Sequence, residues 1–261
     1  MFNRLSFRIC IFLFMMSGAI GKSQASENFV WLDDSDYEPF IYNGEDNRPK
    51  GLFIEVISEV FNRIDKPLTI ELYPWKRTQS LVKSKKGDAM LTIATPERLS
   101  YLSASDPVFT FTWRLFANKK NPNKNILLKA RTAADLRGYR ILSYLGNGWA
   151  EENLKNLKVT YAPKFTQALI MLIQRDTSFD GMIEHDFILK YNINRLIKEG
   201  KLNQEHSEIL EEGTYPFDEV EFRFLIRKDS SYADILPAFN AALSEMREDG
   251  TYHRIYNKYL Q

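Results

Sequence analysis

The first hundred residues alternate between two hydrophobic patterns. Apolar residues from Gly51 to Ile64 recur every three or four positions, which predicts an amphipathic helix. Apolar runs that are too short for helices and partly β-branched predict strands. The predicted strands are residues 28–32, 68–73 and 89–93, and a second, basic helix covers residues 75–86. The order strand, helix, strand, helix, strand indicates βαβ units and a parallel sheet with right-handed crossovers.

The same kind of pattern resumes in the second half of the chain. A strand is predicted at residues 113–118, and the polar residues 119–129 with their Asn-Pro-Asn turn are predicted to be a linker. Further strands are predicted at residues 139–143, 159–161, 179–183 and 222–227, and helices at residues 132–136, 151–157, 165–174, 186–200, 232–248 and 251–260. The helix at residues 186–200 is expected to break near Asn192–Asn194. Two α/β units separated by a linker favour two lobes.

The composition is that of an ordinary globular protein. The chain has 261 residues, enough for one large or two small domains, with 44% apolar and 26% charged residues. Its net charge of +1 gives no indication of a nucleic-acid partner. The aromatic content of 13% could serve a core or a ligand pocket.

The first 25 residues are predicted to be a cleavable signal peptide. Arg4 and Arg8 precede an apolar run of about 12 residues, Ile9–Ile20, and Ser23-Gln24-Ala25 forms a small-residue cleavage site. A membrane anchor is the alternative, but the run is short for a span and the next segment is polar. We therefore expect a protein that is exported to the periplasm.

Cys10, the only cysteine, lies within this signal segment. The mature chain would then have no disulfide and no cysteine-bound metal. An exported protein of this size without disulfides fits a bacterial periplasm better than a eukaryotic secretory route.

Arg98 is the leading candidate for ligand binding. The strand predicted at residues 89–93 ends at a Thr-Pro pair, and Arg98 follows at the strand exit. Ligands of open α/β sheets bind at the carboxyl ends of strands, and the donor fork of arginine suits a carboxylate or phosphate. The alternative is an ordinary loop arginine that pairs with Glu97 or Asp106.

Several short motifs follow one another in a specific order. They are Tyr37-Glu38-Pro39-Phe40, Gly51-Leu52-Phe53-Ile54-Glu55, Trp75 ahead of Lys86-Gly87-Asp88-Ala89, Thr95-Pro96-Glu97-Arg98 ahead of Ser105-Asp106-Pro107, Asp135-Leu136-Arg137-Gly138, and Glu248-Asp249-Gly250-Thr251. In this order and spacing they resemble the periplasmic solute-binding proteins of the polar amino-acid uptake type, the family 3 bacterial extracellular binding proteins. The resemblance covers about residues 29–259.

The resemblance implies an α/β, two-lobe periplasmic binding protein fold (type II). Two hinge crossovers would join the lobes, and the ligand would lie in the cleft between them and be buried by hinge closure. Residues 26–117 with 222–261 would form lobe 1, and residues 118–221 would form lobe 2.

The resemblance also assigns residues of lobe 1 to the ligand site. Arg98 would hold a ligand carboxylate, as the arginine of the family's Thr-Pro-Glu-Arg motif does, with Thr95 at the same strand exit. Tyr37 and Trp75 would enclose the rest of the ligand, and Phe40 and Tyr42 are aromatic alternatives to Tyr37. Arg77, two residues after Trp75, faces either the cleft or solvent.

Lobe 2 would contribute the turn Gly146-Asn147-Gly148. Its backbone N–H groups would contact the ligand carboxylate, and its glycines would let the ligand approach closely. The alternative is a plain turn between a strand and a helix. A lone G-x-G is not a dinucleotide-binding fingerprint.

Two positions depart from the family pattern. The serine or threonine expected five residues before the arginine is Ile93, and the aspartate expected to hold a ligand ammonium is His185. A neutral imidazole does not hold an ammonium as a carboxylate does. Glu184 or Asp186 could substitute after a shift of one residue; otherwise the ligand lacks an α-amino group. This favours an anionic small molecule over an ordinary L-amino acid.

The expected function is binding of a small, polar, carboxylate-bearing solute for delivery to an ABC-type membrane permease. A monomer is expected, with no cofactor, no metal and no nucleic acid. One alternative is a dehydratase-like enzyme acting on a cyclic acid, with Glu184 and His185 as acid and base. A second is a ligand-sensing module for a separate receptor. No H-E-x-x-H or G-x-S-x-G motif occurs in the sequence.

Overall fold

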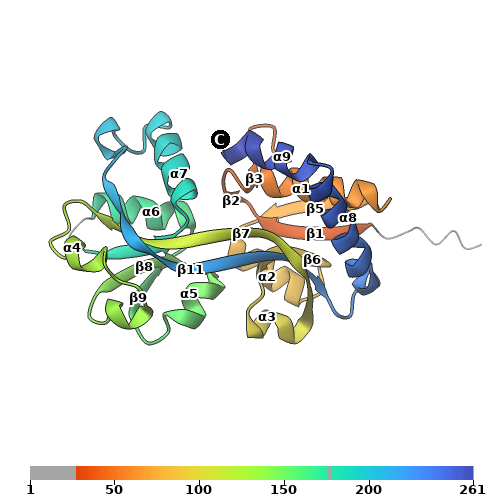
Figure 1. The fold of residues 1–261 in the computed structure, drawn as a ribbon, viewed down its shortest axis with the longest axis horizontal. Coiled ribbons are helices and arrows are strands. Elements are labelled where there is room, and N and C mark those ends of the chain that lie inside the picture. Colours follow the sequence, from red (N-terminus) through yellow and green to blue (C-terminus); the bar gives the residue numbers. More distant parts are fainter. Residues whose placement is uncertain (1–27, 176–177, 261) are drawn as a thin grey trace, which may run out of the picture.

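The computed structural model describes residues 28–175 and 178–260. Two groups of helices and strands lie side by side, and two long strands run through both of them (Figure 1). These strands are β7 (Leu102–Asn118) and β11 (Leu210–Arg227). The predicted signal segment, residues 1–25 with Cys10, lies outside the described residues. No helix in the described part of the chain is long and apolar enough to cross a membrane.

Each group combines strands and helices, as the sequence predicts. Lobe 1 contains β1 (Phe29–Asp34), β2 (Asp36–Tyr37), β3 (Ile41–Asn43), β4 (Pro49–Lys50), α1 (Leu52–Arg63), β5 (Leu68–Tyr73), α2 (Trp75–Lys83), β6 (Ala89–Ile93), α3 (Pro96–Tyr101), α8 (Leu236–Glu248) and α9 (Thr251–Leu260). Lobe 2 contains α4 (Lys124–Leu127), β8 (Arg140–Tyr144), α5 (Gly148–Asn153), β9 (Lys158–Ala162), α6 (Phe165–Gln174), β10 (Gly181–Glu184) and α7 (Asp186–Lys198). Short 3₁₀ turns are Ala133–Leu136, Gln204–His206 and Ala233–Ile235. The residue limits proposed for the lobes stay a prediction.

One sheet of eight strands connects the lobes, in the order β5-β1-β6-β11-β7-β10-β8-β9. Within each lobe the pairs β1–β5, β1–β6, β8–β9 and β8–β10 are parallel. The long strands pair antiparallel with each other and with β6 and β10. The parallel pairs follow from βαβ connections, and the carboxyl ends of β1, β6, β8 and β10 become available to one site.

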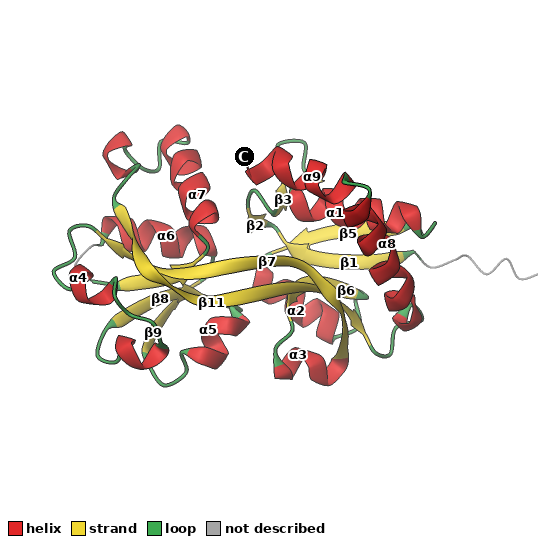
Figure 2. Ribbon diagram, in the orientation of Figure 1, coloured by secondary structure: helices red, strands yellow, loops and turns green. Residues whose placement is uncertain are grey.

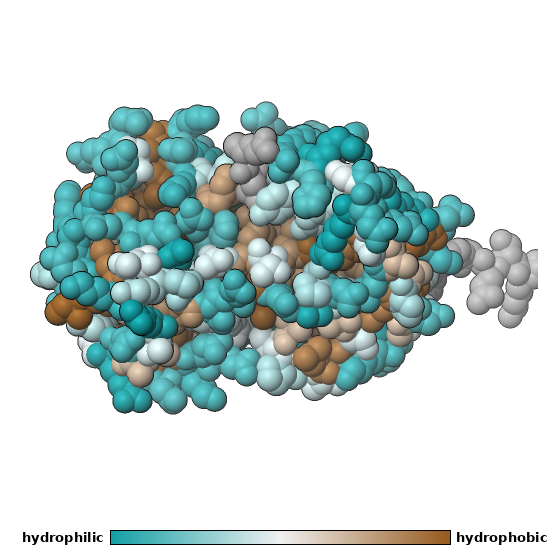
Figure 3. All heavy atoms as spheres, viewed as in Figure 1, coloured by the Kyte–Doolittle hydropathy of each residue, from teal (hydrophilic) through white to brown (hydrophobic). Residues whose placement is uncertain are grey.

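Helices cover both faces of the sheet (Figure 2). The apolar face of α1 is fully buried through Leu52, Phe53, Val56, Ile57, Val60 and Phe61. Burying one such side chain stabilises a fold by about 1.5–3 kcal/mol. On the face drawn in Figure 3 most side chains are hydrophilic, as this inward packing requires.

The predicted linker at residues 119–129 is wrong. Helix α4 lies in this segment, and the buried amide of Asn121 donates a hydrogen bond to the Phe179 carbonyl at 3.0 Å. The lobes are joined by β7 and β11 instead. Because asparagine is common in loops, composition does not distinguish a linker from a packed turn whose amides bind backbone.

Helix α7 is continuous, so the predicted break near Asn192–Asn194 is also wrong. The Asn192 amide donates to the Ile188 carbonyl one turn earlier at 2.9 Å and to the Glu38 carbonyl at 2.6 Å. Tertiary contacts thus outweigh the weak helix propensity of asparagine.

Asp180 is a nearly fully buried carboxylate that holds the start of β8. It accepts hydrogen bonds from Arg140 Nε at 3.0 Å, Arg140 N at 2.8 Å and the Asn121 and Asn123 amides. Burial alone would raise the pKa of Asp180, but the hydrogen bonds from Arg140 and the asparagines outweigh burial and hold the pKa well below its ordinary value.

We expect Asp180→Asn to lower the free energy of unfolding by about 2 kcal/mol at pH 7, measured by urea denaturation. A depressed pKa stabilises the fold above the ordinary pKa of aspartate, 3.8, and this contribution is lost as pH falls. The difference between variant and wild type should therefore narrow below about pH 4. A difference that does not change with pH would contradict this role.

Candidate functional site

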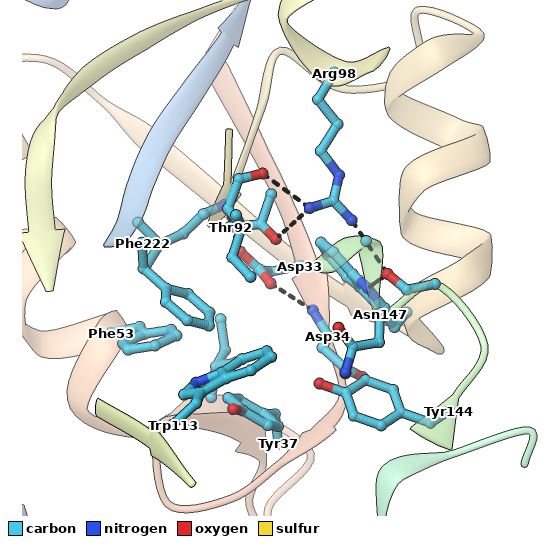
Figure 4. A pocket seen from close by; sticks show the side chains of 16 residues that line it. Asp33, Asp34, Tyr37, Phe53, Thr92, Arg98, Trp113, Tyr144, Asn147 and Phe222 are labelled. Atoms are coloured by element: carbon cyan, nitrogen blue, oxygen red, sulfur yellow. Dashed lines mark hydrogen bonds between the residues drawn. The ribbon is translucent and has the colours of Figure 1, made fainter. Parts of the chain in front are cut away.

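A pocket lies between the lobes at the carboxyl ends of the strands. Its walls come from the ends of β1, β6 and β8, from α2 and α3, from the turn before α5, and from β7 and β11 (Figure 4). Of the predicted site residues, the pocket lining includes Tyr37, Trp75, Arg98, Gly146, Asn147 and Gly148. Thr95, Arg77, Glu184 and His185 are not part of the lining.

Arg98 is held in the pocket wall by the first turn of α3. The Thr95 hydroxyl caps this helix at the Arg98 N–H, and Pro96 occupies the first helical position. The Arg98 side chain is buried, and its Nη1 donates to Thr92 Oγ1 at 3.0 Å and to the Ile93 carbonyl at 2.9 Å. These two bonds fix the plane of the guanidinium. The Thr92 hydroxyl, next to Ile93 in the chain, thus contacts Arg98 directly.

Arg98 has no acidic partner among the described residues. Glu97 instead pairs with Lys83 at 2.9 Å, and Asp106 forms no ion pair in the described chain. The alternative of an ordinary loop ion pair is therefore not what the structure shows. Burial lowers the pKa of Arg98, yet the guanidinium remains charged at neutral pH.

The Gly146 carbonyl joins the two lobes at the pocket. It accepts hydrogen bonds from Trp75 Nε1 at 2.7 Å, Gln79 Nε2 at 3.3 Å and Arg98 Nη2 at 3.1 Å. Gly146 has φ of +85°, where glycine is strongly favoured, and a Cβ at Gly148 would lie 2.9 Å from Arg98 Nη2. We call Trp75, Gln79, Arg98 and Gly146 the Gly146 cluster.

Asn147 has a local structural contact. Its side-chain oxygen accepts from the Ala150 N–H at 3.1 Å and so caps α5, which has only six residues. The backbone of this turn lies in the pocket wall. Its most evident contact is the hydrogen bond that the Gly146 carbonyl accepts from Trp75 of lobe 1.

Two pocket carboxylates are absent from the sequence prediction. Asp33 accepts from Trp31 Nε1 at 2.7 Å and Leu91 N at 2.8 Å, and burial raises its pKa to about 7. Asp34 is half-buried and has no cation within 4 Å in the described chain; burial and then the Asp33 charge raise its pKa to about 8. The available signal is a pair of acids directly after the strand predicted at residues 28–32.

Glu184 lies behind the pocket at the end of β10. It is fully buried and accepts from the Tyr37 hydroxyl of lobe 1 at 3.2 Å and from the His185 N–H at 3.0 Å. Burial raises the pKa of Glu184 to about 7, although hydrogen bonds from His185 N, Tyr37 and Tyr144 lessen the effect. The Tyr37–Glu184 bond is a second contact between the lobes.

His185 and Arg77, which do not line the pocket, each contact an aromatic ring. The His185 ring packs edge-on against Phe111 at 4.9 Å between ring centroids, and burial lowers its pKa, so the imidazole is neutral at pH 7. Arg77 is exposed on α2, with its guanidinium 4.7 Å from the centre of the Tyr73 ring.

Trp113 on β7 is a further pocket residue that the sequence pattern does not reveal. It is 1% exposed, and its Nε1 has no hydrogen-bond partner among the residues described. Its ring packs edge-on against Trp149 of α5 at 5.1 Å. An unpaired buried N–H is costly, so a solute oxygen is a suitable partner for it.

Comparisons with known proteins agree on one family. The sequence profile of the bacterial extracellular solute-binding proteins, family 3, matches residues 30–261. The lysine/arginine/ornithine-binding periplasmic protein of Escherichia coli K12 is 23% identical, over 94% of this chain and 95% of its own. The L-cystine-binding protein TcyA of Bacillus subtilis 168 is 26% identical, over 86% of this chain and 78% of its own.

The solved structures show the same architecture. The arginine-, lysine-, histidine-binding protein ArtJ of Geobacillus stearothermophilus superposes with a TM-score of 0.70 at 18% identity, over 89% of this chain and 95% of that chain. At this identity the likeness establishes the fold alone. It confirms the predicted α/β fold of a two-lobe periplasmic binding protein.

Gly148→Ala should separate the lobes at the Gly146 cluster, because the added methyl group would meet the Arg98 guanidinium. The readout is solvent exchange of the Trp75 indole N–H, followed by NMR; we expect exchange to become at least about tenfold faster. Gly138→Ala is the control for general destabilisation. A side chain at Gly138 strains the backbone because φ is positive, but the added methyl group would meet no other atom within 4 Å. Equal exchange in both variants would contradict the proposed clash.

Glu184→Gln should become more stable than the wild type as pH rises. The pKa of Glu184 is raised from 4.5 to about 7 in the folded state. Ionisation of Glu184 therefore opposes folding increasingly as pH rises through this range, and by about 3 kcal/mol once pH is above it. Urea denaturation at pH 5 and pH 8 should show a small difference at pH 5 and a clear gain for the variant at pH 8. Asp33 and Asp34 are present in both proteins, so the difference isolates Glu184.

Proposed function

The chain belongs to the bacterial extracellular solute-binding proteins, family 3, and we propose that it captures a small carboxylate-bearing solute in the periplasm for an ABC-type permease. The names of the curated relatives support an amino-acid solute, since they bind lysine, arginine or ornithine in one case and cystine in another. Capture would follow the closing of two lobes on the pocket, without covalent chemistry.

The observation that carries the proposal is the buried guanidinium of Arg98 in a pocket shared by both lobes. Nη1 is fixed by Thr92 and the Ile93 carbonyl, whereas Nη2 faces Gln79 and the Gly146 carbonyl. A solute carboxylate can replace the Gly146 carbonyl at Nη2. A charged acceptor forms a hydrogen bond roughly twice as strong as a neutral one, so the exchange favours the solute.

Asp34 supports a positive group on the same solute. Its carboxylate lines the pocket without a cationic partner in the described chain, and an ammonium would offset the cost of burying it. This changes the expectation of a purely anionic solute, which depended on His185 replacing an aspartate. The carboxylate on lobe 1 makes an amino acid chemically suitable even without one at His185.

Aromatic side chains would enclose the rest of the solute. One region of the pocket is lined by Tyr37, Phe53, Trp113 and Phe222. The Trp75 ring lies against the Arg98 guanidinium, whose central carbon is 5.5 Å from the centre of that ring. We propose that Trp113 Nε1 donates a hydrogen bond to a solute oxygen. The dehydratase-like alternative has less support, because neither Glu184 nor His185 lines the pocket.

Arg98→Lys should weaken solute binding at least about tenfold, because lysine keeps the charge but not the two-pronged donor geometry. The solute would first be identified by thermal shift with L-arginine, L-lysine, L-glutamine and L-cystine, and affinities then measured by titration calorimetry. Arg77→Ala is the matched control, since Arg77 is exposed on the adjacent helix. Undiminished affinity in Arg98→Lys would refute the anchor, and a loss in Arg77→Ala would place the site elsewhere.

A further inference from the structure

A third contact between the lobes lies away from the pocket. Glu38, which follows β2 in lobe 1, meets one face of α7 in lobe 2. Its carboxylate accepts from the Tyr191 hydroxyl at 2.8 Å and pairs with Arg195 Nε at 3.2 Å, and its carbonyl accepts from the Asn192 amide at 2.6 Å. We call these four residues the Glu38 cluster; none of them lines the pocket.

The side chains of α7 are already in place for this contact. Tyr191 and Asn192 are adjacent, and Arg195 lies about one helical turn after them. The Asn192 oxygen accepts from Arg195 Nη2 at 2.8 Å, while its amide also donates to the Ile188 carbonyl. Because Asn192 and Arg195 are held by contacts within their own helix, these two side chains lose little additional entropy in contacting Glu38.

The surroundings allow the Glu38 cluster to contribute measurable energy. The side chains of Glu38 and Arg195 are only 18% and 22% exposed, so solvent screens the pair less than at an open surface. Thr166 of α6 adds a neighbouring contact between the lobes, donating to Asp36 at 2.8 Å. The Gly146 cluster and the Glu38 cluster therefore connect the lobes at separate places, with α7 facing the β2–β3 region in Figure 1.

We propose that the Glu38 cluster is a positioning contact that favours the closed arrangement of the lobes whatever solute is in the pocket. A solute that binds the closed arrangement has an apparent affinity scaled by the closed fraction. A change in the Glu38 cluster would therefore scale the affinity for every solute by the same factor. Selectivity would stay with the pocket residues, since no side chain of the cluster lines the pocket.

The test measures the distance between the lobes without any solute. Cys10 is the only cysteine, so a Cys10→Ser background can carry two spin labels at cysteines replacing the exposed Lys66 and Lys155. Glu38→Gln removes the charge that Arg195 pairs with and keeps the side-chain shape. Double electron–electron resonance should show a longer-distance population that grows about tenfold relative to the closed population.

Glu45→Gln is the matched control, because Glu45 is an exposed glutamate of the same lobe that loses the same charge. Tyr191→Phe is a second variant, expected to shift the distances in the same direction by a smaller factor. A distribution unchanged in Glu38→Gln, or shifted equally in Glu45→Gln, overturns the proposal. Since no solute is present, failure here would leave the proposed capture of a carboxylate untouched.

Discussion

The structure depends on a guanidinium, that of Arg98, which is buried without an ion pair to any acid of the described chain. Desolvating Arg98 is costly, and the hydrogen bonds that offset this cost in the described chain go to neutral acceptors: Thr92, the Ile93 carbonyl, Gln79 and the Gly146 carbonyl. One of these acceptors belongs to the opposite lobe. The charge that would recognise a solute is therefore the same charge that draws the two lobes together, so binding and closing share one group.

Three acidic side chains lie in the wall of the same pocket or behind it. Asp33, Asp34 and Glu184 all have raised pKa values because burial disfavours their ionised forms. Asp33 and Asp34 both accept hydrogen bonds from N–H groups, and neither forms an ion pair with a described cation. A solute with both a carboxylate and an ammonium would provide an opposite charge for Arg98 and favour the ionised form of Asp34, which neither an anion nor a cation alone would do.

Local signals in the sequence predicted much of the fold. Strands β5 and β6 and helices α6 and α9 have the predicted limits, because periodicity and bounding Pro or Gly residues lie within each segment. The position of Arg98 at the pocket was predictable for the same reason, and its role in binding stays a prediction. Asp34, Trp113 and the first half of β11 were not, since their importance depends on partners from distant segments. From the sequence alone, a polar residue at a strand exit is predicted to be an ordinary loop residue. Its place in a pocket becomes evident only when the position of the opposite lobe is known.

The arrangement of contacts separates recognition from closure. The Gly146 cluster lies in the pocket wall, so any solute that competes for Arg98 also alters this contact between the lobes. Glu38 and α7 lie outside the pocket, so a solute there need not displace any atom of their contact. In the proposed arrangement, closure need not weaken when a carboxylate displaces the Gly146 carbonyl, because the Glu38 cluster would still hold the lobes together. That division lets pocket residues change solute preference without also having to supply all of the closing energy.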